Sequence, residues 1–539
     1  MTTANPAGAP RGTQPWSKTS PESHWDYIVI GSGMGGMACA ALLAKLGRKV
    51  LVIEQHYVPG GFTHAFKRKK WHWDVGVHVV GEVTDHTITG RILKDLSGDR
   101  LEWKSVGKYY ENMYFPDGFE IHFPDNPREF RAMLDEKFPD EKEALDKYFQ
   151  ALAAANSAMQ AYYGAKIMPG VLQGIGDAFM TKKADPFLRR TTKEVLDEIT
   201  DNRRLKAVLT SQWGYYGSTP SESAFGIHAM VARHFFHGGF YPVGGAPSIA
   251  KALLKTVEES GGWTRIRSEV DEILVKGGKA VGVRLKNGDE ISADRIISAA
   301  GARQTVERML PESLRPAEWS RSISKVEPSE CHVCLYLGMN GDIEKAGATG
   351  GNQWFFGTWD MEDKWWDATD PNSVPNVLFT SYPSLKDPLH DPGPDQIHMG
   401  EIITFIPYSN VKKWSTTELF KRGDDYEEFK QSMHERVLNR YLENRPEMKD
   451  LITYSEVSTP LSTEHFARSY HGSIYGLDAS PNRYTNPYLK PRTPVKNLYL
   501  AGSDVVSCGV MGAMIGGVLS AVAAEPIGGI KYLKQFTKR

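Results

Sequence analysis

The sequence predicts an α/β fold in two domains, from the length of the chain and from two glycine-rich stretches near its ends. The 539 residues exceed the roughly 250–300 residues that one hydrophobic core supports. Residues 26–54 read as strand, glycine turn, helix and second strand, and residues 497–521 read as strand, Gly-Ser-Asp turn and a helix of small residues. This alternation predicts a parallel sheet covered by helices.

The first stretch carries a dinucleotide-binding motif. Apolar residues 27–30 predict a buried strand, and Gly31, Gly33 and Gly36 follow it in the spacing G-x-G-x-x-G. The first glycine permits a tight turn, the second lets a pyrophosphate approach the backbone, and the third lets helix and strand pack closely. The pyrophosphate is expected at the N-terminus of the helix, where free N–H groups favour negative charge. Glu54, at the end of the next strand, is placed to accept hydrogen bonds from ribose hydroxyls.

The composition is that of a globular protein, with 41% hydrophobic and 24% charged residues, and the net charge of −1 gives no reason to expect a nucleic-acid partner. No apolar run reaches the ~18 residues of a membrane-spanning helix. Cys331-x-x-Cys334 lies in a predicted strand and lacks the second pair of a zinc site. We therefore expect structural cysteines, no metal site and a reducing, cytoplasmic setting.

The predicted strands and helices alternate in some parts of the chain and not in others, and this difference predicts the domain organisation. Residues 1–24, rich in Pro, Ser, Thr and Gly, are expected to be a disordered arm. The dinucleotide-binding domain is expected to be discontinuous, and a substrate domain of mixed β-sheet and helices is expected to be inserted into it. The dinucleotide-binding domain is expected to comprise residues 25–83, 236–324 and 478–539. The substrate domain is expected to comprise residues 84–235 and 325–477. Helices are expected over residues 127–138, 141–155 and 425–444, and a tryptophan-rich loop around Trp354.

Three further segments have two interpretations each. The basic run at residues 67–70 is either a hairpin tip or a contact for phosphate or an anionic surface. The apolar, glycine-containing segment 161–183 either lies in a membrane interface or forms a helical lid. The basic, amphipathic tail 530–539 suits an anionic membrane surface or a frayed terminus. Gly60 and Gly61 are expected to carry the backbone past the cofactor.

The motifs resemble one enzyme family over residues 26–524. They are the glycine motif, Pro59-Gly60-Gly61, the run Tyr-Pro-Val-Gly-Gly at residues 241–245 and the C-terminal Gly-Ser-Asp turn with its helix. Together they resemble the FAD-dependent phytoene desaturase, carotenoid isomerase and retinol saturase family, within the flavin amine oxidase-like superfamily. Residues 60–81 look similar to bacterial members that desaturate acyl chains during furan fatty acid synthesis.

The resemblance implies non-covalent FAD in a Rossmann-like domain of the two-dinucleotide-binding-domain type. It implies that Val270 contacts the adenine, that Asp504, after Gly502, binds the ribityl–pyrophosphate region, and that Val510 and Met511 lie along the flavin ring. It also implies an enzyme that is peripheral on a membrane and takes a water-insoluble substrate from it. A second G-x-G-x-x-G unit for NAD(P)H is missing from the sequence, so electrons are expected to be exchanged with a separate, unidentified partner.

His78 is the leading catalytic candidate, because it follows Asp74-x-Gly76, where family members place a residue beside the flavin. Imidazole also suits proton exchange near neutral pH. A hydrogen-bonded core histidine is the alternative. Weaker candidates are His64, His72, Tyr215, Tyr216 and Tyr241.

Four functions are compatible with these features. The first is an FAD-dependent oxidoreductase that desaturates, saturates or isomerises a long lipid chain, with a membrane-lipid fatty acyl chain as the first choice. The second is the same chemistry on a carotenoid or retinoid polyene. The third is an amine oxidase, for which Trp71, Trp73 and Asp74 offer a cation cage. The fourth is a non-catalytic, FAD-bound escort protein. The sequence leaves open the direction of reaction, the bond position and the oligomeric state.

Overall fold

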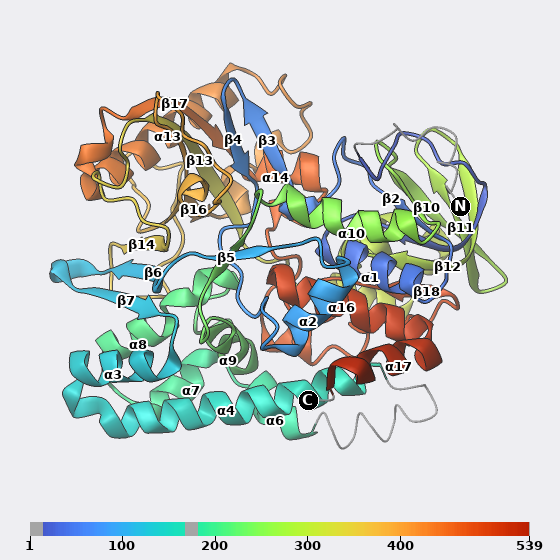
Figure 1. Cartoon of the computed structure of the whole chain (residues 1–539), viewed down its shortest axis with the longest axis horizontal. Coiled ribbons are helices and arrows are strands. Elements are labelled where there is room, and N and C mark those ends of the chain that lie inside the picture. Colours follow the sequence, from blue (N-terminus) through green and yellow to red (C-terminus); the bar gives the residue numbers. More distant parts are fainter. Residues whose placement is uncertain (1–13, 168–181, 538–539) are drawn as a thin grey trace.

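Two seven-stranded sheets lie side by side, with a group of helices beside the second sheet (Figure 1). The structure, a computed structural model, describes residues 14–167 and 182–537. Within these ranges no helix combines the length and apolar character needed to cross a membrane.

The first sheet contains the dinucleotide motif and confirms the predicted α/β fold. Strand β1 pairs in parallel with β2 on one side and β12 on the other, and β18 also joins β12 in parallel. The order is β10-β11-β12-β1-β2-β9. The strands are β1 His24–Ile30, β2 Val50–Ile53, β9 Trp263–Arg265, β10 Val270–Lys276, β11 Lys279–Leu285, β12 Glu290–Ser298 and β18 Leu498–Leu500. All four residues of β2 are buried, as expected for a parallel strand between two layers.

Helix α1 (Met34–Lys45) packs against α10 (Pro247–Glu259) and α16 (Gly509–Ala524) on this sheet. The packing is close because glycines meet backbone directly. A Cβ on Gly36 would lie 2.0 Å from the carbonyl oxygen of Gly31, and a Cβ on Gly517 would lie 2.0 Å from that of Gly35. The third glycine of the motif therefore serves the packing that the sequence predicts.

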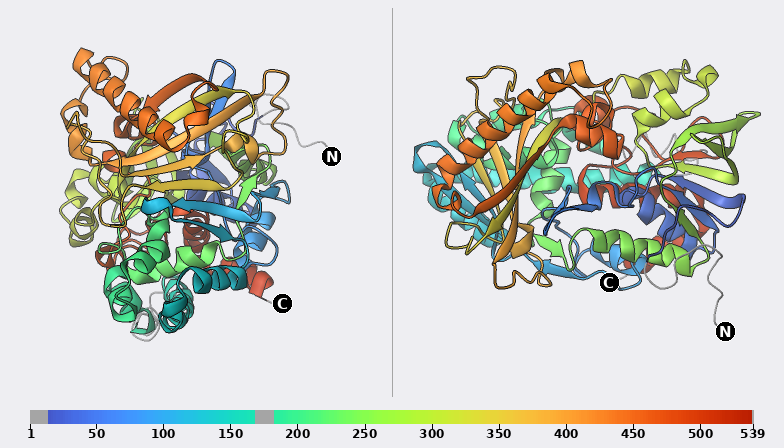
Figure 2. Two further views of the ribbon diagram at one scale, coloured as in Figure 1. Left: turned by 90° about the vertical axis from the view of Figure 1, so that its left-hand side faces the viewer. Right: turned by 90° about the horizontal axis from the view of Figure 1, so that it is seen from above.

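The second sheet has the order β17-β13-β16-β15-β14-β6-β7 and is antiparallel except for the β14–β6 pair. Helix α13 (Asp424–Asn444) packs on it (Figure 2). The strands are β6 Tyr109–Tyr114, β7 Glu120–Pro124, β13 Cys331–Asn340, β14 Asn352–Phe356, β15 Val377–Ser381, β16 Ile397–Ile406 and β17 Ile452–Ser458. Trp354, expected in a loop, belongs to β14. All four cysteines are free and buried.

A hairpin from the N-terminal segment packs on this second sheet. It consists of β3 (Ala65–Arg68) and β4 (Trp71–Asp74), and its tip is formed by Lys69 and Lys70. The indole N–H of Trp73 donates to the carbonyl of Leu337 at 2.9 Å, and a Cβ on Gly338 would meet the Trp71 ring. The basic run therefore spans the end of β3 and the turn of the hairpin, and a part of segment 25–83 lies against the sheet of the other predicted domain.

A layer of helices lies next to the second sheet (Figure 1). They are α3 Pro127–Lys137, α4 Lys142–Ala165, α6 Lys182–Leu188, α7 Thr192–Ile199, α8 Arg203–Thr210 and α9 Phe225–His234. Helix α4 runs past the predicted end at residue 155 to Ala165, and its buried Asn156 side chain donates to the carbonyl of Ala229 in α9. Most of the candidate interface segment 161–183 lies outside the described residues.

Both ends of the described chain pack on the fold. Ser17 donates from its N–H to the carbonyl of Thr264 and pairs with Arg265 of β9, so the arm predicted over residues 1–24 is ordered at this point. At the other end, α17 (Pro526–Thr537) packs on α2 (Ile88–Leu96), and the Tyr532 hydroxyl donates to Asp95 at 2.7 Å.

Candidate functional site

A cavity of about 2130 Å³ connects the dinucleotide motif with the second sheet and with the helical layer. Its walls include the carboxyl ends of β1, β2 and β12, which is where open α/β sheets bind ligands. It is also lined by Ile88, Leu533 and Phe536 of α2 and α17. The cavity thus runs from the glycine motif to the α2–α17 pair.

Two helix N-termini face the cavity near the motif. Helix α1 begins after Gly33 and α16 begins after Cys508, and neither has a side chain that caps its first N–H groups. Gly33 has open space where a Cβ would be, so a ligand can approach its backbone there. Val510 and Met511, in the first turn of α16, also line the cavity. Such paired helix ends suit a pyrophosphate and an electron-rich ring.

Glu54 lines the cavity and organises the loop around it. One carboxylate oxygen accepts hydrogen bonds from the N–H (3.0 Å) and the hydroxyl (2.6 Å) of Ser32, and the other accepts from the N–H of His56 at 2.7 Å. The Ser32 hydroxyl in turn accepts from the N–H of Gly60. Glu54 therefore fixes the glycine loop, and its remaining lone pairs can still receive ribose hydroxyls.

The remaining predicted cofactor residues divide into two groups. Gly31, Gly61, Val270, Gly502 and Asp504 line the cavity, whereas Gly36 and Gly60 do not and act through the packing and hydrogen bonds described above. Asp504 accepts from the N–H of Ala302 at 2.7 Å and from that of Leu477 at 3.0 Å, so it joins three chain segments at the cavity wall. The open glycine cradle, the helix ends and the two acids fit an FAD molecule.

His78 lies in the cavity wall opposite the FAD cradle, between the cavity and the second sheet. Its ring lines the cavity, and its Nδ1 lies 2.9 Å from Oε2 of Glu401 in β16. Burial and the nearby Lys386 lower the pKa of His78 to about 3, so the imidazole is neutral at physiological pH. Burial raises the pKa of Glu401 to about 8, and Lys386 opposes that rise in part.

A buried polar cluster surrounds this pair. Lys386 Nζ donates to the carbonyl of His78 and to the hydroxyl of Ser381, both at 2.8 Å, and to the side chain of Asn352. Burial lowers the pKa of Lys386 to about 8, against the opposing effect of three carboxyl groups. Two of these groups, Asp74 and Glu111, have their own pKa values raised by burial, to about 8 and about 7.

Tyr215 forms a second contact between the cavity and this cluster. It lines the cavity, and its hydroxyl donates to Glu111, which also accepts from the indole N–H of Trp354 at 2.8 Å. Sequence reasoning missed Glu111, Lys386 and Glu401. Two of them stand inside apolar strands, YYENMY and EIITFI, and a charged residue in a buried strand is a usable signal because burying it requires a partner.

Of the weaker catalytic candidates, His64 and Tyr215 line the cavity and the others do not. Tyr241 is buried and its hydroxyl donates to Asp74, and the Tyr216 hydroxyl forms a hydrogen bond with His228. His72 lies on the β3–β4 hairpin. Trp71, Trp73 and Asp74, the proposed cation cage, are also packed away from the cavity.

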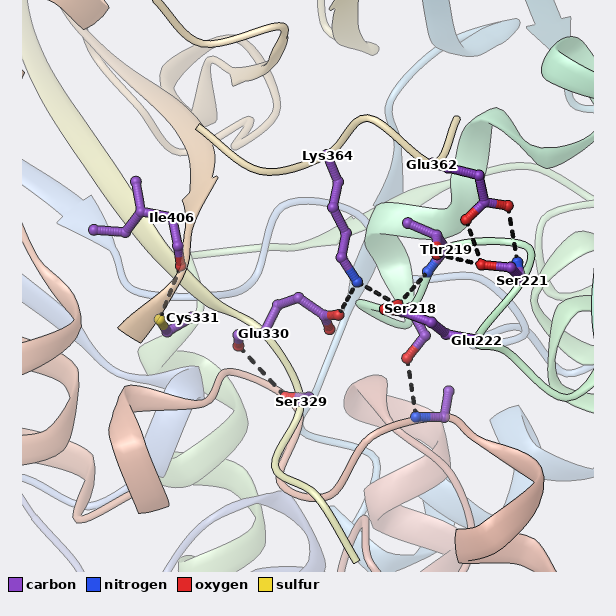
Figure 3. A network of polar contacts seen from close by, with 11 residues as sticks. Ser218, Thr219, Ser221, Glu222, Ser329, Glu330, Cys331, Glu362, Lys364 and Ile406 are labelled. Carbon is purple, nitrogen blue, oxygen red and sulfur yellow. Dashed lines mark hydrogen bonds and ion pairs between the residues drawn. The ribbon is translucent and has the colours of Figure 1, made fainter. Parts of the chain in front are cut away.

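A second buried charge network lies outside the cavity wall (Figure 3). Lys364 donates to Glu222 and Glu330, and Glu362 accepts from the N–H and hydroxyl of Ser221. Burial raises the pKa of Glu330 to about 7. This network ties the loop after β14 to the segment before α9. In the described part of the chain, no cluster of His, Cys, Asp or Glu is arranged to hold a metal ion.

Comparisons with known proteins agree with this arrangement. Residues 34–524 match the family described as Flavin containing amine oxidoreductase. The all-trans-retinol 13,14-reductase of Danio rerio is 30% identical over 515 residues, which are 91% of this chain and 84% of the relative. The chloroplastic prolycopene isomerase of Daucus carota is 27% identical over 531 residues, 93% of this chain and 80% of the relative. A solved oxidoreductase from Methanosarcina mazei, 16% identical, shares the fold with a TM-score of 0.60 over 91% of this chain and 98% of its own.

Proposed function

The chain belongs to the flavin-containing amine oxidoreductase family and is an FAD-dependent oxidoreductase, and from this premise we propose that it acts on a carbon–carbon double bond of a long conjugated polyene. The resemblance drawn from the sequence motifs is confirmed by the same match and by the two relatives. Their names, a retinol reductase and a prolycopene isomerase, support a polyene over the fatty acyl chain that the sequence favoured first.

The observation that carries the proposal is the continuous cavity between the FAD cradle and the α2–α17 pair. Where it borders the second sheet the cavity is lined by aromatic rings, among them Tyr215, Trp354, Phe379 and Phe405. Flat rings of this kind contact a conjugated chain over its whole face and exclude water from it. Bound FAD supplies the hydride exchange with a carbon atom. The protein's own contribution is to orient the chain, keep the site dry and provide a proton partner.

An amine substrate has less support. A cationic amine needs aromatic faces or carboxylates around its charge, and the three residues that the sequence offered for this role do not line the cavity. A non-catalytic escort also has less support, because the retinol reductase of Danio rerio is 30% identical, whereas the relative named as inactive is 27% identical.

We further propose that the α2–α17 end of the cavity docks on a membrane surface. Three isoleucines there are exposed: Ile527 by 91%, Ile88 by 48% and Ile530 by 40%. Helix α17 also carries Lys531 and Lys534, which suit anionic headgroups. A substrate that leaves the bilayer at this point enters the cavity without crossing water. The electron partner is then a separate molecule, as the sequence predicts.

The test uses the purified yellow protein, reduced with dithionite under anaerobic conditions and mixed with all-trans-retinol in detergent. We expect loss of polyene absorbance and a product heavier by two mass units; an isomerase gives a shifted retention time at unchanged mass. Lipids co-purified from the expression host are compared by mass spectrometry with those of a cradle variant. Unchanged polyenes together with acyl chains lighter by two units would overturn the polyene proposal in favour of acyl desaturation.

A further inference from the structure

The buried cluster behind His78 contains more acids than its lysine can neutralise. Asp74, Glu111 and Glu401 are each buried, and each acts electrostatically on Lys386. A single ammonium group balances one carboxylate, and uncompensated buried charges are strongly disfavoured. The cluster therefore reaches neutrality only if two of its three carboxyl groups keep their protons. The raised pKa values of all three acids agree with this count.

Glu401 is the acid of the cluster that contacts a cavity-lining imidazole. No side chain donates a hydrogen bond to either of its oxygens, while Nδ1 of His78 lies 2.9 Å from Oε2 and has no other partner among the described residues. A protonated Glu401 would donate to that nitrogen and satisfy both groups. The titratable or charged groups that face Glu401 are His78, Lys386, Asp74, Tyr241, Cys334 and Tyr336.

His78 cannot deliver a proton as an ordinary imidazolium acid. Its burial beside Lys386 keeps the ring neutral, and a neutral imidazole carries one N–H. When Glu401 donates to Nδ1, the ring proton resides on Nε2. The ring can then release that proton only if it gains another at Nδ1 in the same step. An acid in contact with Nδ1 meets this requirement.

We propose that Glu401 and His78 form a proton relay, in which Glu401 stores the proton that His78 transfers to a substrate carbon in the cavity. This inference rests on the proposed function. Reduction of a double bond adds a hydride, which the cofactor supplies, and a proton, which this relay supplies. The C–H bond forms with the Nε2 proton while the O–H bond of Glu401 breaks and Nδ1–H forms. Glu401 is left as a carboxylate, so the cluster carries one negative charge more than Lys386 balances until water returns the proton between turnovers.

The first test measures protonation directly and does not depend on turnover. Infrared spectra of the wild-type holoenzyme and of E401Q are recorded at neutral pH, and their difference isolates this one side chain. We expect the carbonyl stretch of a protonated carboxylic acid, shifted in D₂O. A difference spectrum with carboxylate bands alone would overturn the relay, because a merely structural Glu401 paired with Lys386 would be ionised.

The second test measures reduction of the polyene by the dithionite-reduced holoenzyme. In E401Q the amide can still orient His78 but cannot release a proton, so we expect a rate at least about 100-fold lower, the usual effect of losing a general acid. H78Q should show a similar loss with FAD still bound. E330Q is the matched control, because Glu330 is also a buried acid beside a lysine but its partner is Lys364 and not His78 (Figure 3).

The outcomes separate the two proposals. If the wild type reduces the polyene and E401Q does so at the same rate, the relay is wrong and the proposed function stands. A wild type that converts no polyene contradicts the proposed function, and the infrared band then decides alone whether Glu401 stores a proton. Partial recovery of the rate in E401D, which restores an ionisable proton at a longer distance from Nδ1, would support the relay over a packing role.

Discussion

Two glycines of the same motif are predicted to fail in different ways when each is replaced by alanine. Gly33 has φ −64° and ψ 172°, which alanine adopts freely, and its Cβ would enter open space in the cofactor cradle. Gly36 lies in α1, and its Cβ would be 2.0 Å from the carbonyl oxygen of Gly31. G33A is therefore expected to lose FAD affinity, and G36A to lose stability.

The magnitudes follow from these contacts. In G36A the helix and the strand must separate, and overpacking of this kind costs about 1–3 kcal/mol, more than the ~1 kcal/mol that alanine gains over glycine in a helix. In G33A the methyl group stands where the pyrophosphate approaches the backbone. Losing a hydrogen bond to a charged group costs about 1.5–3 kcal/mol, which corresponds to roughly 10- to 150-fold weaker FAD binding.

The assay combines urea unfolding of the apoprotein, followed by circular dichroism, with FAD titration followed by quenching of flavin fluorescence. G33A should unfold at the wild-type urea concentration and bind FAD weakly, and G36A should unfold at lower urea. Wild-type FAD affinity in G33A would refute the placement of the pyrophosphate at Gly33. Wild-type stability in G36A would show that the helix–strand contact is looser than the structure has it.

Three further predictions concern other parts of the molecule. E54A removes the acceptor for the N–H groups of Ser32 and His56, so it should lower the free energy of unfolding by about 1–3 kcal/mol and weaken FAD binding. An unchanged free energy of unfolding in urea and an unchanged FAD affinity in the titration would contradict this prediction. Because the pKa of Glu401 is raised from 4.5 to about 8 in the folded state, the native protein holds a proton that the unfolded chain has lost, and this one group should lower the free energy of unfolding by up to about 1.4 kcal/mol per pH unit between pH 6.5 and 8. Urea unfolding at several pH values should show a shallower fall in E401Q, and an equal slope would mean that Glu401 is ionised when folded. Replacing Ile527 and Ile530 by glutamate should reduce sedimentation with anionic vesicles, whereas L389E, at an exposed leucine elsewhere, should not; equal losses would contradict docking through α17.

Local sequence patterns predicted the dinucleotide-binding sheet well. The strand–glycine–helix order predicted β1, α1 and β2, although β1 begins at His24 and not at residue 27, because a turn, a helix start and two apolar strands are all encoded within about thirty adjacent positions. The cradle residues followed from the same logic, and most of them line the cavity. Trp354 was misplaced because its strand is defined by pairing with β15, the next strand along the chain, and with β6, which comes from a distant part of the chain.

The sequence by itself thus determined the cofactor end of this protein, since that site is made by backbone geometry and by one acid at a fixed distance along the chain. Only the tertiary structure decided which residues form the cavity wall opposite the cofactor. His78 could be suspected from its neighbours in the motif, but its partner Glu401 and the lysine between the acids stand more than three hundred residues away. Their burial and mutual contact set the protonation state of each group, and burial exists only once the two sheets have packed around the cavity.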